Sequence, residues 1–435
     1  MPAMYLADIL SEHYESFFAV TNEILENLVV ANQYKAISHS GFKPLFGMEH
    51  SYLTKEKKQK AGFWNLVKSH QNNEIYEFRK KELYEIVERI NAKVVIIDIF
   101  SSTDFLVLNN HPDNLILLFF NPMLSTYQIG DFPIISDGTW FKNQSKTVVK
   151  QNIRSRFINY LKNPKESILN QIIEKQKKEI LVKSGVSEID FENENPFTKM
   201  FRNVPELISA PLEFEISPEI KQSFQYYLGL CTREKREDTE LDSSFYEDWQ
   251  VIVSKKEQGY KIVYCSFGTF YTGPDKALFT FLENLQIIVK ELGNLQLVVS
   301  VNQIIIETLK DKIDINQNVF FFTKVPQLIV LKNVDLFITH GGLGSIKEAI
   351  EYEIPMLVYP LDLQYDQNGN ALKVELHGIG LRGNFKFERA IDMKTKIERL
   401  LTQKTYKEKL KEMNQNIKRK YTKESNLQIL NQLGL

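Results

Sequence analysis

Short apolar runs recur along this chain of 435 residues, and stretches of helical length separate most of them. Strands that are apolar on both faces and alternate with helices are typical of parallel sheets covered on both sides. The pattern therefore predicts an α/β fold with a doubly wound sheet in each half of the chain. The runs are FFAVT (17–21), KVVIIDIF (93–100), NLILLFF (114–120), KIVYCSFG (261–268), LQLVVSV (295–301), NVFFFT (318–323), VDLFITH (334–340) and PMLVYP (355–360).

A charged segment separates the two groups of runs. The stretch CTREKREDTELDSSFYEDW (231–249) is dense in charge and poor in aliphatic residues, which is typical of a solvated linker. We therefore expect an N-terminal domain over residues 1–230, a linker over 231–250 and a C-terminal domain over 251–410. A final helix over 411–435 could pack back on the N-terminal domain.

Composition and net charge restrict the binding partners and the cellular compartment to be expected. The net charge of −1 gives no reason to expect nucleic acid or an anionic membrane as partner. Two cysteines, Cys231 and Cys265, make no disulfide framework and favour a reducing, cytoplasmic setting. The N-terminus lacks the pattern of a secretory signal, and no apolar run is long enough to span a bilayer. The lysine-rich stretch 165–185 favours a surface helix, and peripheral membrane contact stays open.

The stretch DLFITHGGLGSIKEAI (335–350) places a histidine, glycines and a serine where a strand passes into a helix. A helix N-terminus offers unpaired N–H groups, and glycines let a ligand approach the backbone closely. His340 can donate a hydrogen bond there, so the stretch could bind a diphosphate. Ser345 and Glu348 also fit a helix-capping box, which requires no ligand. Both interpretations stay open on this stretch alone.

The longer segment 324–371 resembles the donor-binding signature of the UDP-glycosyltransferase family (glycosyltransferase family 1, GT-B fold). Weaker resemblance lies in KIVYCSFGT (261–269) and in VPELISAPLEFE (204–215). The residues that match the signature are Pro326, Gln327, His340, Gly342, Ser345, Glu348, Pro355, Pro360, Asp366, Gln367 and Asn370.

This resemblance implies two Rossmann-like domains that face a cleft, with the acceptor bound by the N-terminal domain and the nucleotide-sugar by the C-terminal domain. It implies an inverting transfer of a sugar from a UDP-sugar, with UDP-glucose the expected donor, to a hydroxyl of a small lipophilic acceptor. The UDP-sugar is a co-substrate, and the resemblance implies no cofactor and no metal.

The resemblance also assigns roles to individual residues. His340 would bind the donor diphosphate beside the start of the following helix. Glu348 would accept hydrogen bonds from the ribose hydroxyls, and Gln327 would meet the uracil edge. Asp366 and Gln367 would hold the hydroxyls of the sugar. The diphosphate site would be completed by Ser266, Gly268, Thr269, Gly342, Gly344 and Ser345.

The chain departs from the family pattern at several positions of this segment. Lys324 stands where the family often has a uracil-stacking tryptophan, and Phe322 could replace that ring. Gly344 stands where an asparagine is common, which removes one polar side chain from the diphosphate site. Glu353 stands where a glycine is usual, which should alter a turn rather than the chemistry.

A larger departure concerns the catalytic base. Asp98, at the end of KVVIID, matches the aspartate that orients the catalytic histidine in this family. The family's first strand and the histidine after it have no counterpart, so an open sheet centre is expected to expose apolar surface and unpaired backbone groups. Three other histidines, His13, His39 and His50, favour surface or packed positions.

Three functions therefore compete. The first is a UDP-sugar-dependent transferase, the second a sugar-nucleotide-binding protein without catalysis, and the third another GT-B enzyme such as a nucleotide-sugar epimerase. The pairs Pro326-Gln327 and Asp366-Gln367 favour the transferase family over an epimerase. The absent base keeps the binding protein open.

Overall fold

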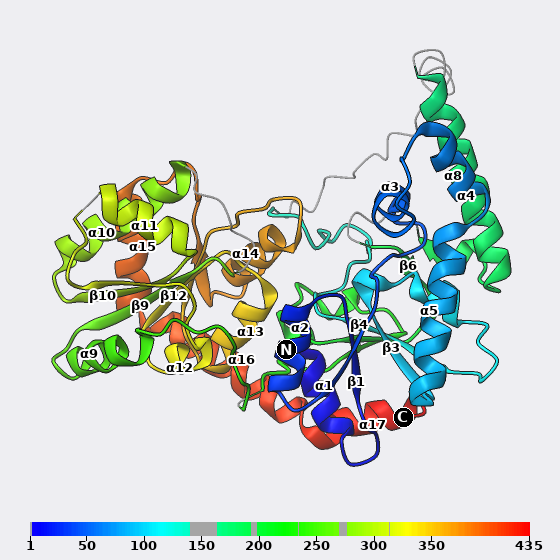
Figure 1. Ribbon diagram of the computed structural model, residues 1–435. Helices are drawn as coiled ribbons and strands as arrows, with labels where there is room; N and C mark the ends of the chain where they lie inside the picture. The colour runs from blue at the N-terminus through cyan, green and yellow to red at the C-terminus, as the bar shows by residue number, and fades with distance from the viewer. Residues whose placement is uncertain (1, 140–162, 193–197, 234, 269–275, 313) are drawn as a thin grey trace.

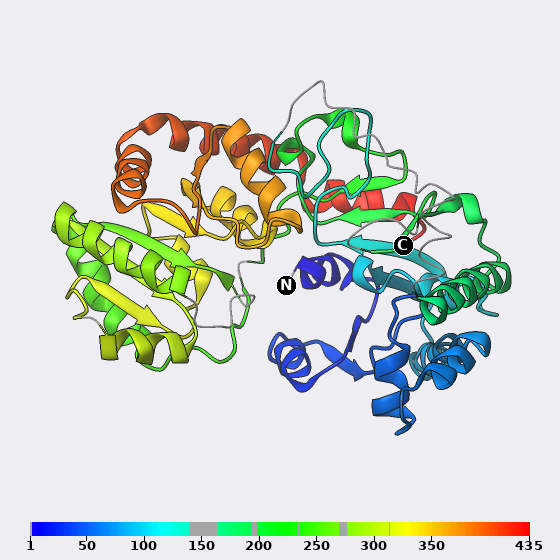
Figure 2. The ribbon, with the colours of Figure 1, turned by 90° about the horizontal axis from the view of Figure 1, so that it is seen from above.

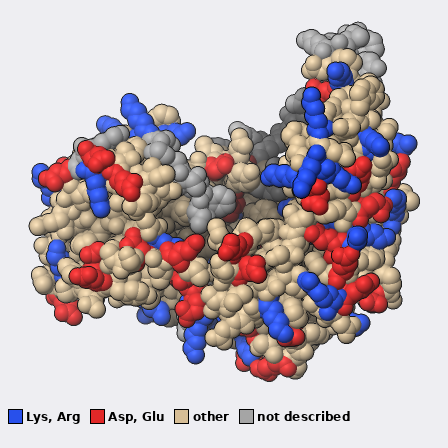
Figure 3. Space-filling view, in the orientation of Figure 1, with Lys and Arg blue, Asp and Glu red and all other residues tan. Residues whose placement is uncertain are grey.

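The two halves of the chain form separate sheets with helices around them, and the molecule is hollowed between the halves (Figures 1 and 3). The computed structural model describes residues 2–139, 163–192, 198–233, 235–268, 276–312 and 314–435. Lysines, arginines and acidic residues are interspersed over the face seen in Figure 3. The predicted α/β class, with two Rossmann-like domains of the GT-B type, is confirmed.

The C-terminal half contains one six-stranded sheet in the order β11-β10-β9-β12-β13-β14, and all its pairs are parallel. Its strands are β9 (Lys261–Ser266), β10 (Leu295–Ser300), β11 (Val319–Phe322), β12 (Leu336–Thr339), β13 (Met356–Val358) and β14 (Gly380–Arg382). Its helices are α9 (Phe245–Glu257), α10 (Lys276–Leu292), α11 (Gln303–Lys312), α12 (Gln327–Leu331), α13 (Leu343–Glu351), α14 (Asp366–Leu376), α15 (Ala390–Thr402) and α16 (Lys404–Lys420).

Strand β9 shows why the sequence signal was a continuous apolar run. Val263 and Cys265 face one apolar cluster, which includes Leu282 of α10. Ile262 and Tyr264 face the other cluster, on the opposite side of the sheet. Because helices cover both faces, every position after the first is buried, and the usual alternation of polar and apolar residues disappears.

The N-terminal half contains two separate parallel sheets, a four-stranded one in the order β3-β4-β7-β8 and a two-stranded one of β1 and β2. Its strands are β1 (Phe17–Val20), β2 (Lys35–Ser38), β3 (Val94–Asp98), β4 (Ile116–Asn121), β7 (Glu206–Ile208) and β8 (Gln225–Tyr227), with an antiparallel pair of β5 (Phe191–Glu192) and β6 (Met200–Phe201) beside them. Its helices are α1 (Pro2–Leu10), α2 (Glu23–Ala31), α3 (Glu49–Ser51), α4 (Phe63–Gln71), α5 (Glu74–Ile90), α6 (Asp104–Leu108) and α8 (Pro164–Lys183).

Strands β1 and β3 each keep one edge unpaired. No ladder joins them within the described ranges. Val94, Val95 and Ile96 of β3 are only half-buried, whereas the middle residues of β9 are fully buried. An open edge with half-exposed apolar residues can accept another strand.

The chain returns to the N-terminal half at its end (Figures 1 and 2). Helix α16 packs on α13, and α17 (Lys423–Gln432) packs on α1. Leu430 is fully buried among apolar residues of the N-terminal half. The expected single helix over 411–435 is therefore wrong, because α16 ends at Lys420 and Thr422 caps a new helix.

The linker is shorter than the predicted 231–250. Phe245 and Trp249 stack on one another inside the core of the C-terminal half, so the helix α9 begins within the charged segment. Cys231 is likewise buried, against apolar residues of the N-terminal half, rather than solvated. The structure places Cys231 in the N-terminal half and α9 in the C-terminal half, so the linker is the shorter stretch between them.

No helix in the described ranges is long and apolar enough to cross a membrane. Helix α8, which corresponds to the lysine-rich stretch 165–185, packs against α4. It buries Gln176, Ile180 and Leu181.

Candidate functional site

The carboxyl ends of β9 and β12 lie side by side and place two predicted site residues together. Ser266 is the register partner of Thr339, the residue before His340. Ser266 is buried, and its hydroxyl lies 3.4 Å from the N–H of Gly268. In an open parallel sheet, this end of adjacent strands is where ligands bind.

The imidazole of His340 lies between two glycines. A Cβ on Gly268 would lie 2.9 Å from the ring's Cε1, and a Cβ on Gly342 would lie 2.6 Å from its Nε2. Its Nδ1 atom is buried and makes no hydrogen bond of normal geometry with the described residues. Burial lowers the pKa of His340 to about 4, although the Ser266 backbone opposes this shift. The ring is therefore neutral at pH 7 and can donate one hydrogen bond.

Helix α13 begins at Leu343, three residues after this histidine. Gly342 is its N-cap, and no described side chain caps the helix, so the capping-box alternative for Ser345 and Glu348 does not hold. Ser345 is instead the third residue of the helix, with its hydroxyl 3.5 Å from the side-chain amide of Gln327. A Cβ on Gly344 would meet nothing within 4 Å. At Gly344 the first turn therefore faces a space free of described atoms, and the backbone N–H groups of this turn have no partner inside the helix.

Glu348, near the end of α13, has two side-chain partners. Its Oε1 accepts a hydrogen bond from Nη1 of Arg236 at 2.5 Å, and its Oε2 accepts one from Nε2 of Gln327 at 2.6 Å. The hydroxyl of Tyr264 donates to the other end of the Gln327 amide at 3.4 Å. Sequence reasoning missed Arg236, because one arginine in a charged segment carries no signal of its own.

The start of α14 lies against the turn that follows His340. Gly341 has a φ of 90°, and a Cβ there would lie 3.1 Å from the backbone oxygen of Gln367. Asn370 donates hydrogen bonds to the backbone oxygen of Gly341 and to Asp366, both at 2.9 Å. Burial raises the pKa of Asp366, although the bond from Asn370 opposes this shift. Asp366 and Gln367 thus stand beside the His340 turn.

Part of Gln367 is already engaged. Its Oε1 accepts hydrogen bonds from the backbone N–H groups of Leu361 at 2.9 Å and Asp362 at 3.1 Å. Only the NH₂ end of this amide therefore remains to meet a ligand hydroxyl.

A segment from the N-terminal half reaches α14. The backbone oxygen of Ile135 would lie 1.9 Å from a Cβ on Gly369, so only glycine fits there. Asn368 donates a hydrogen bond to the backbone oxygen of Ser136 at 3.1 Å. Arg382 donates to the backbone oxygen of Gly138 at 2.7 Å. The N-terminal half therefore touches the residues next to Asp366 and Gln367, a contact that the sequence did not indicate.

Asp98 is the last residue of β3. Its Oδ1 accepts a hydrogen bond from the N–H of Phe100 at 2.8 Å. Desolvation by neighbouring atoms raises the pKa of Asp98, while the hydrogen bond from Phe100 and the charge of Lys43 oppose this shift. The residue as a whole is nevertheless exposed. Within the described ranges, no imidazole is hydrogen-bonded to it.

The three histidines of the N-terminal half that the sequence analysis considered, His13, His39 and His50, have other surroundings than Asp98. His39 lies 2.9 Å from the guanidinium of Arg79, and its Nδ1 accepts from the N–H of Gly41. His13 and His50 are exposed.

Four further positions complete the comparison with the prediction. Thr269 lies outside the described residues. Phe322 is fully buried and packs edge-on against Phe245, so it cannot stack on a base and the expected replacement is wrong. Lys324 pairs with Glu240 at 3.6 Å. Glu353 keeps a φ of 57°, so this turn retains the left-handed backbone that glycine favours.

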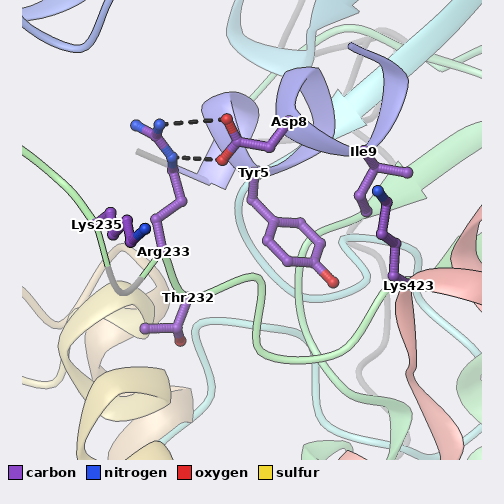
Figure 4. A pocket seen from close by; sticks show the side chains of 7 residues that line it. All are labelled: Tyr5, Asp8, Ile9, Thr232, Arg233, Lys235 and Lys423. Atoms are coloured by element: carbon purple, nitrogen blue, oxygen red, sulfur yellow. Dashed lines mark hydrogen bonds and ion pairs between the residues drawn. The ribbon is translucent and has the colours of Figure 1, made fainter. Parts of the chain in front are cut away.

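A cavity of about 480 Å³ lies elsewhere, between α1, the linker and α17 (Figure 4). Tyr5, Asp8, Arg233, Lys235 and Lys423 are among its lining residues. Arg233 forms a bidentate ion pair with Asp8, in which the two N–O distances are 2.6 and 3.2 Å. None of the predicted site residues that the structure describes lines this cavity, so it is distinct from the site around His340. The described residues contain no group of three metal-ligating side chains.

Comparison with known proteins agrees with the geometry. The family described as "UDP-glucoronosyl and UDP-glucosyl transferase" matches residues 154–421. An uncharacterized UDP-glucosyltransferase, YojK, of Bacillus subtilis (strain 168) is 36% identical over 107 residues, which is 24% of this chain and 25% of that protein. Zeaxanthin glucosyltransferase of Pantoea ananas is 33% identical over 84 residues, 19% of each chain. The chain thus aligns with a quarter or less of the length of these relatives.

Solved structures share the fold over nearly the whole chain. The glycosyltransferase of kitacinnamycin has a TM-score of 0.65 at 16% identity, covering 99% of this chain and 95% of its own. UDP-glucose: anthocyanidin 3-O-glucosyltransferase in complex with UDP has a TM-score of 0.60 at 13% identity, covering 100% and 95%.

Proposed function

This chain belongs to the UDP-glycosyltransferase family, and on that premise we propose that it transfers a sugar from a UDP-sugar to a hydroxyl of a small lipophilic acceptor. The proposal includes inversion at the sugar carbon and UDP-glucose as the donor. Relatives that carry the names UDP-glucosyltransferase and UDP-glucuronosyltransferase support a UDP-sugar as donor.

The observation that carries the proposal is the neutral, glycine-flanked His340 at the start of α13. The diphosphate of the donor is proposed to lie over Gly344 and to accept hydrogen bonds from His340 and from the first turn of the helix. Glu348 and Gln327, joined at 2.6 Å, are proposed to meet the ribose and the base. Asp366 and the NH₂ of Gln367 are proposed to hold the sugar hydroxyls.

In the proposed reaction the acceptor oxygen attacks the sugar carbon, the bond from that carbon to the diphosphate breaks, and UDP leaves with the electron pair. The helix N-terminus and His340 stabilise the charge that develops on the diphosphate. Because the described residues place no imidazole beside Asp98, the proton of the acceptor hydroxyl passes to solvent water. The proposed setting is a soluble protein in the cytoplasm, acting without a metal or a further cofactor.

A second candidate function is a sugar-nucleotide-binding protein with impaired catalysis. The exposed Asp98, beside which the described residues place Phe100 and Lys43 but no hydrogen-bonded imidazole, favours it. General-base catalysis typically contributes about 10²–10⁴-fold to rate, so without a base near Asp98 turnover would be slow while donor binding remained.

A transfer and hydrolysis assay separates the two candidates. The protein is incubated with a panel of UDP-, dTDP- and GDP-sugars and a simple phenol, and both glycoside and free nucleotide are measured. Glycoside formed from a UDP-sugar supports the transferase. Binding of UDP-sugar without glycoside supports the binding protein. Activity with only non-uridine donors would contradict the proposed donor.

A further inference from the structure

Arg236 of the linker is bound to the carboxylate that is proposed to hold the donor ribose. Its guanidinium donates to Oε1 of Glu348 at 2.5 Å and to Oδ1 of Asp238 at 2.9 Å. The exposed fraction is 12% for the Arg236 side chain and 13% for that of Glu348. This pair is therefore not an ordinary surface salt bridge, which would contribute little.

We propose that Arg236 is a positioning residue for nucleotide recognition, which orients the Glu348 carboxylate so that both of its oxygens accept hydrogen bonds from a vicinal diol, the 2′- and 3′-hydroxyls of a nucleoside. The proposal rests on the proposed function, since it takes Glu348 as the ribose-binding residue. It adds a residue of the linker to a site otherwise built from the C-terminal half.

The number of acceptor positions on the carboxylate supports this role. An ionised carboxylate offers about four lone-pair positions, two on each oxygen. Arg236 takes one position on Oε1, and Gln327 takes one on Oε2. One position remains on each oxygen, which matches a diol that donates two hydrogen bonds. With a separate donor on each oxygen, the carboxylate plane has little freedom to rotate.

The chain around Arg236 is held before any ligand binds. Asn32, at the end of α2, donates to the backbone oxygen of Glu237 at 3.1 Å and accepts from its N–H at 3.2 Å. Arg233 donates to Asn32 at 2.8 Å and also pairs with Asp8 of α1, as Figure 4 shows. These contacts fasten the linker to the N-terminal half.

On its other side the linker is fastened to the C-terminal half. Asp242 accepts hydrogen bonds from the N–H of Thr323 at 2.9 Å and from its hydroxyl at 3.0 Å, and the N–H of Asp242 donates to the backbone oxygen of Lys324 at 2.9 Å. Arg236 lies between these two attachments. The guanidinium is planar and binds two carboxylates at once in fixed directions, which a lysine ammonium cannot reproduce.

The test is a comparison of ribose discrimination by calorimetry. UDP and 2′-deoxy-UDP are titrated into the wild type, Arg236→Met and Arg236→Lys. The matched control is Arg389→Met, which removes an arginine that is paired with Asp392 on the surface of α15. Thermal unfolding of each variant shows whether it is folded, and Arg236→Lys retains the charge if the methionine variant unfolds.

We expect the wild type and the control to bind UDP about tenfold or more tightly than 2′-deoxy-UDP, because a hydrogen bond to a charged group is lost. Arg236→Met should bind UDP more weakly and 2′-deoxy-UDP almost as before, so that the ratio falls to about twofold or less. Arg236→Lys should give an intermediate ratio.

A merely structural role of Arg236 would weaken the binding of both ligands equally and keep the wild-type ratio, and that result would overturn the proposal. Absence of UDP binding to the wild type would overturn the donor site itself, and this proposal with it.

Discussion

Gly268 faces the imidazole of His340 so closely that a Cβ on the glycine would lie 2.9 Å from the ring's Cε1. The same glycine has a φ of 65°, a conformation that residues with a side chain rarely adopt. The turn after β9 and the turn after β12 therefore fit one another only while residue 268 is glycine. The ring is thereby held at the place where the donor diphosphate is proposed to bind.

Gly268→Ala should damage both the fold and the site. The left-handed backbone costs a residue such as alanine about 1–3 kcal/mol, and the new methyl group must push the ring of His340 aside. We expect a lower free energy of unfolding in urea and UDP binding weaker by about tenfold or more. Unchanged UDP affinity would mean that the position of His340 does not matter to the ligand.

Gly344→Ala should separate stability from binding. A Cβ at this helical position meets nothing within 4 Å, so the empty protein should be unchanged or stabilised by about 0.5–1 kcal/mol. The proposed diphosphate lies in that same open space, and the methyl group should therefore weaken UDP binding. Thermal unfolding and calorimetry on the same preparation measure the two effects. Full UDP affinity in this variant would exclude the diphosphate from the first turn of α13.

The titration of His340 tests the electrostatics of the site. Burial should keep the ring neutral down to a pKa of about 4, against an ordinary value of 6.5. The folded state then binds fewer protons than the unfolded state between these two values, so His340 lowers stability as pH falls through this window. Binding of UDP should raise the pKa, because the diphosphate favours the protonated ring. NMR of the imidazole, assigned with His340→Gln, measures both values. A titration midpoint at or above 6.5 in the free protein would contradict the buried, neutral ring.

The sequence predicted the C-terminal half well because the strands there are buried on both faces. It missed β14 (Gly380–Arg382) in that half, and in the N-terminal half it missed β2, β7, β8 and the pair β5 and β6, all of which are short. Glu206 is fully buried on β7, and its carboxylate accepts hydrogen bonds from Asn121 at 2.6 Å and from Gln225 at 3.0 Å. Such a strand depends on partners that are distant in sequence, which no local pattern indicates.

The site residues also divide into those that a local pattern predicts and those that depend on partners distant in the sequence. The turns around His340, Gly342 and Asp366 follow from strand ends and glycines, which are local features. The alternative of a capping box at Ser345 does not hold, because Gly342, three residues earlier, is the N-cap of the helix. Arg236 reaches Glu348 from 112 positions away in the chain, and a charged segment gives no hint of which arginine will be buried.

The open edges of β1 and β3 suggest a test of the catalytic base, which the described residues do not place beside Asp98. An added N-terminal strand that ends in Gly-His should increase transferase turnover by about 10²–10⁴-fold, the usual contribution of a general base. Asp98→Asn should then remove much of that gain, and an extension ending in Gly-Ala serves as the control. Equal turnover with both extensions would show that Asp98 does not orient a histidine at this place.

The central claim is that UDP binds at His340 and Glu348, and calorimetry with UDP on the wild type, His340→Ala and Glu348→Ala tests it most directly. We expect the wild type to bind and each variant to lose on the order of 1.5–3 kcal/mol of binding free energy, the range for hydrogen bonds to charged groups. His50→Ala, which changes an exposed histidine of the N-terminal half, should bind as the wild type does. A wild type that fails to bind UDP, or variants that bind it unchanged, would contradict the account.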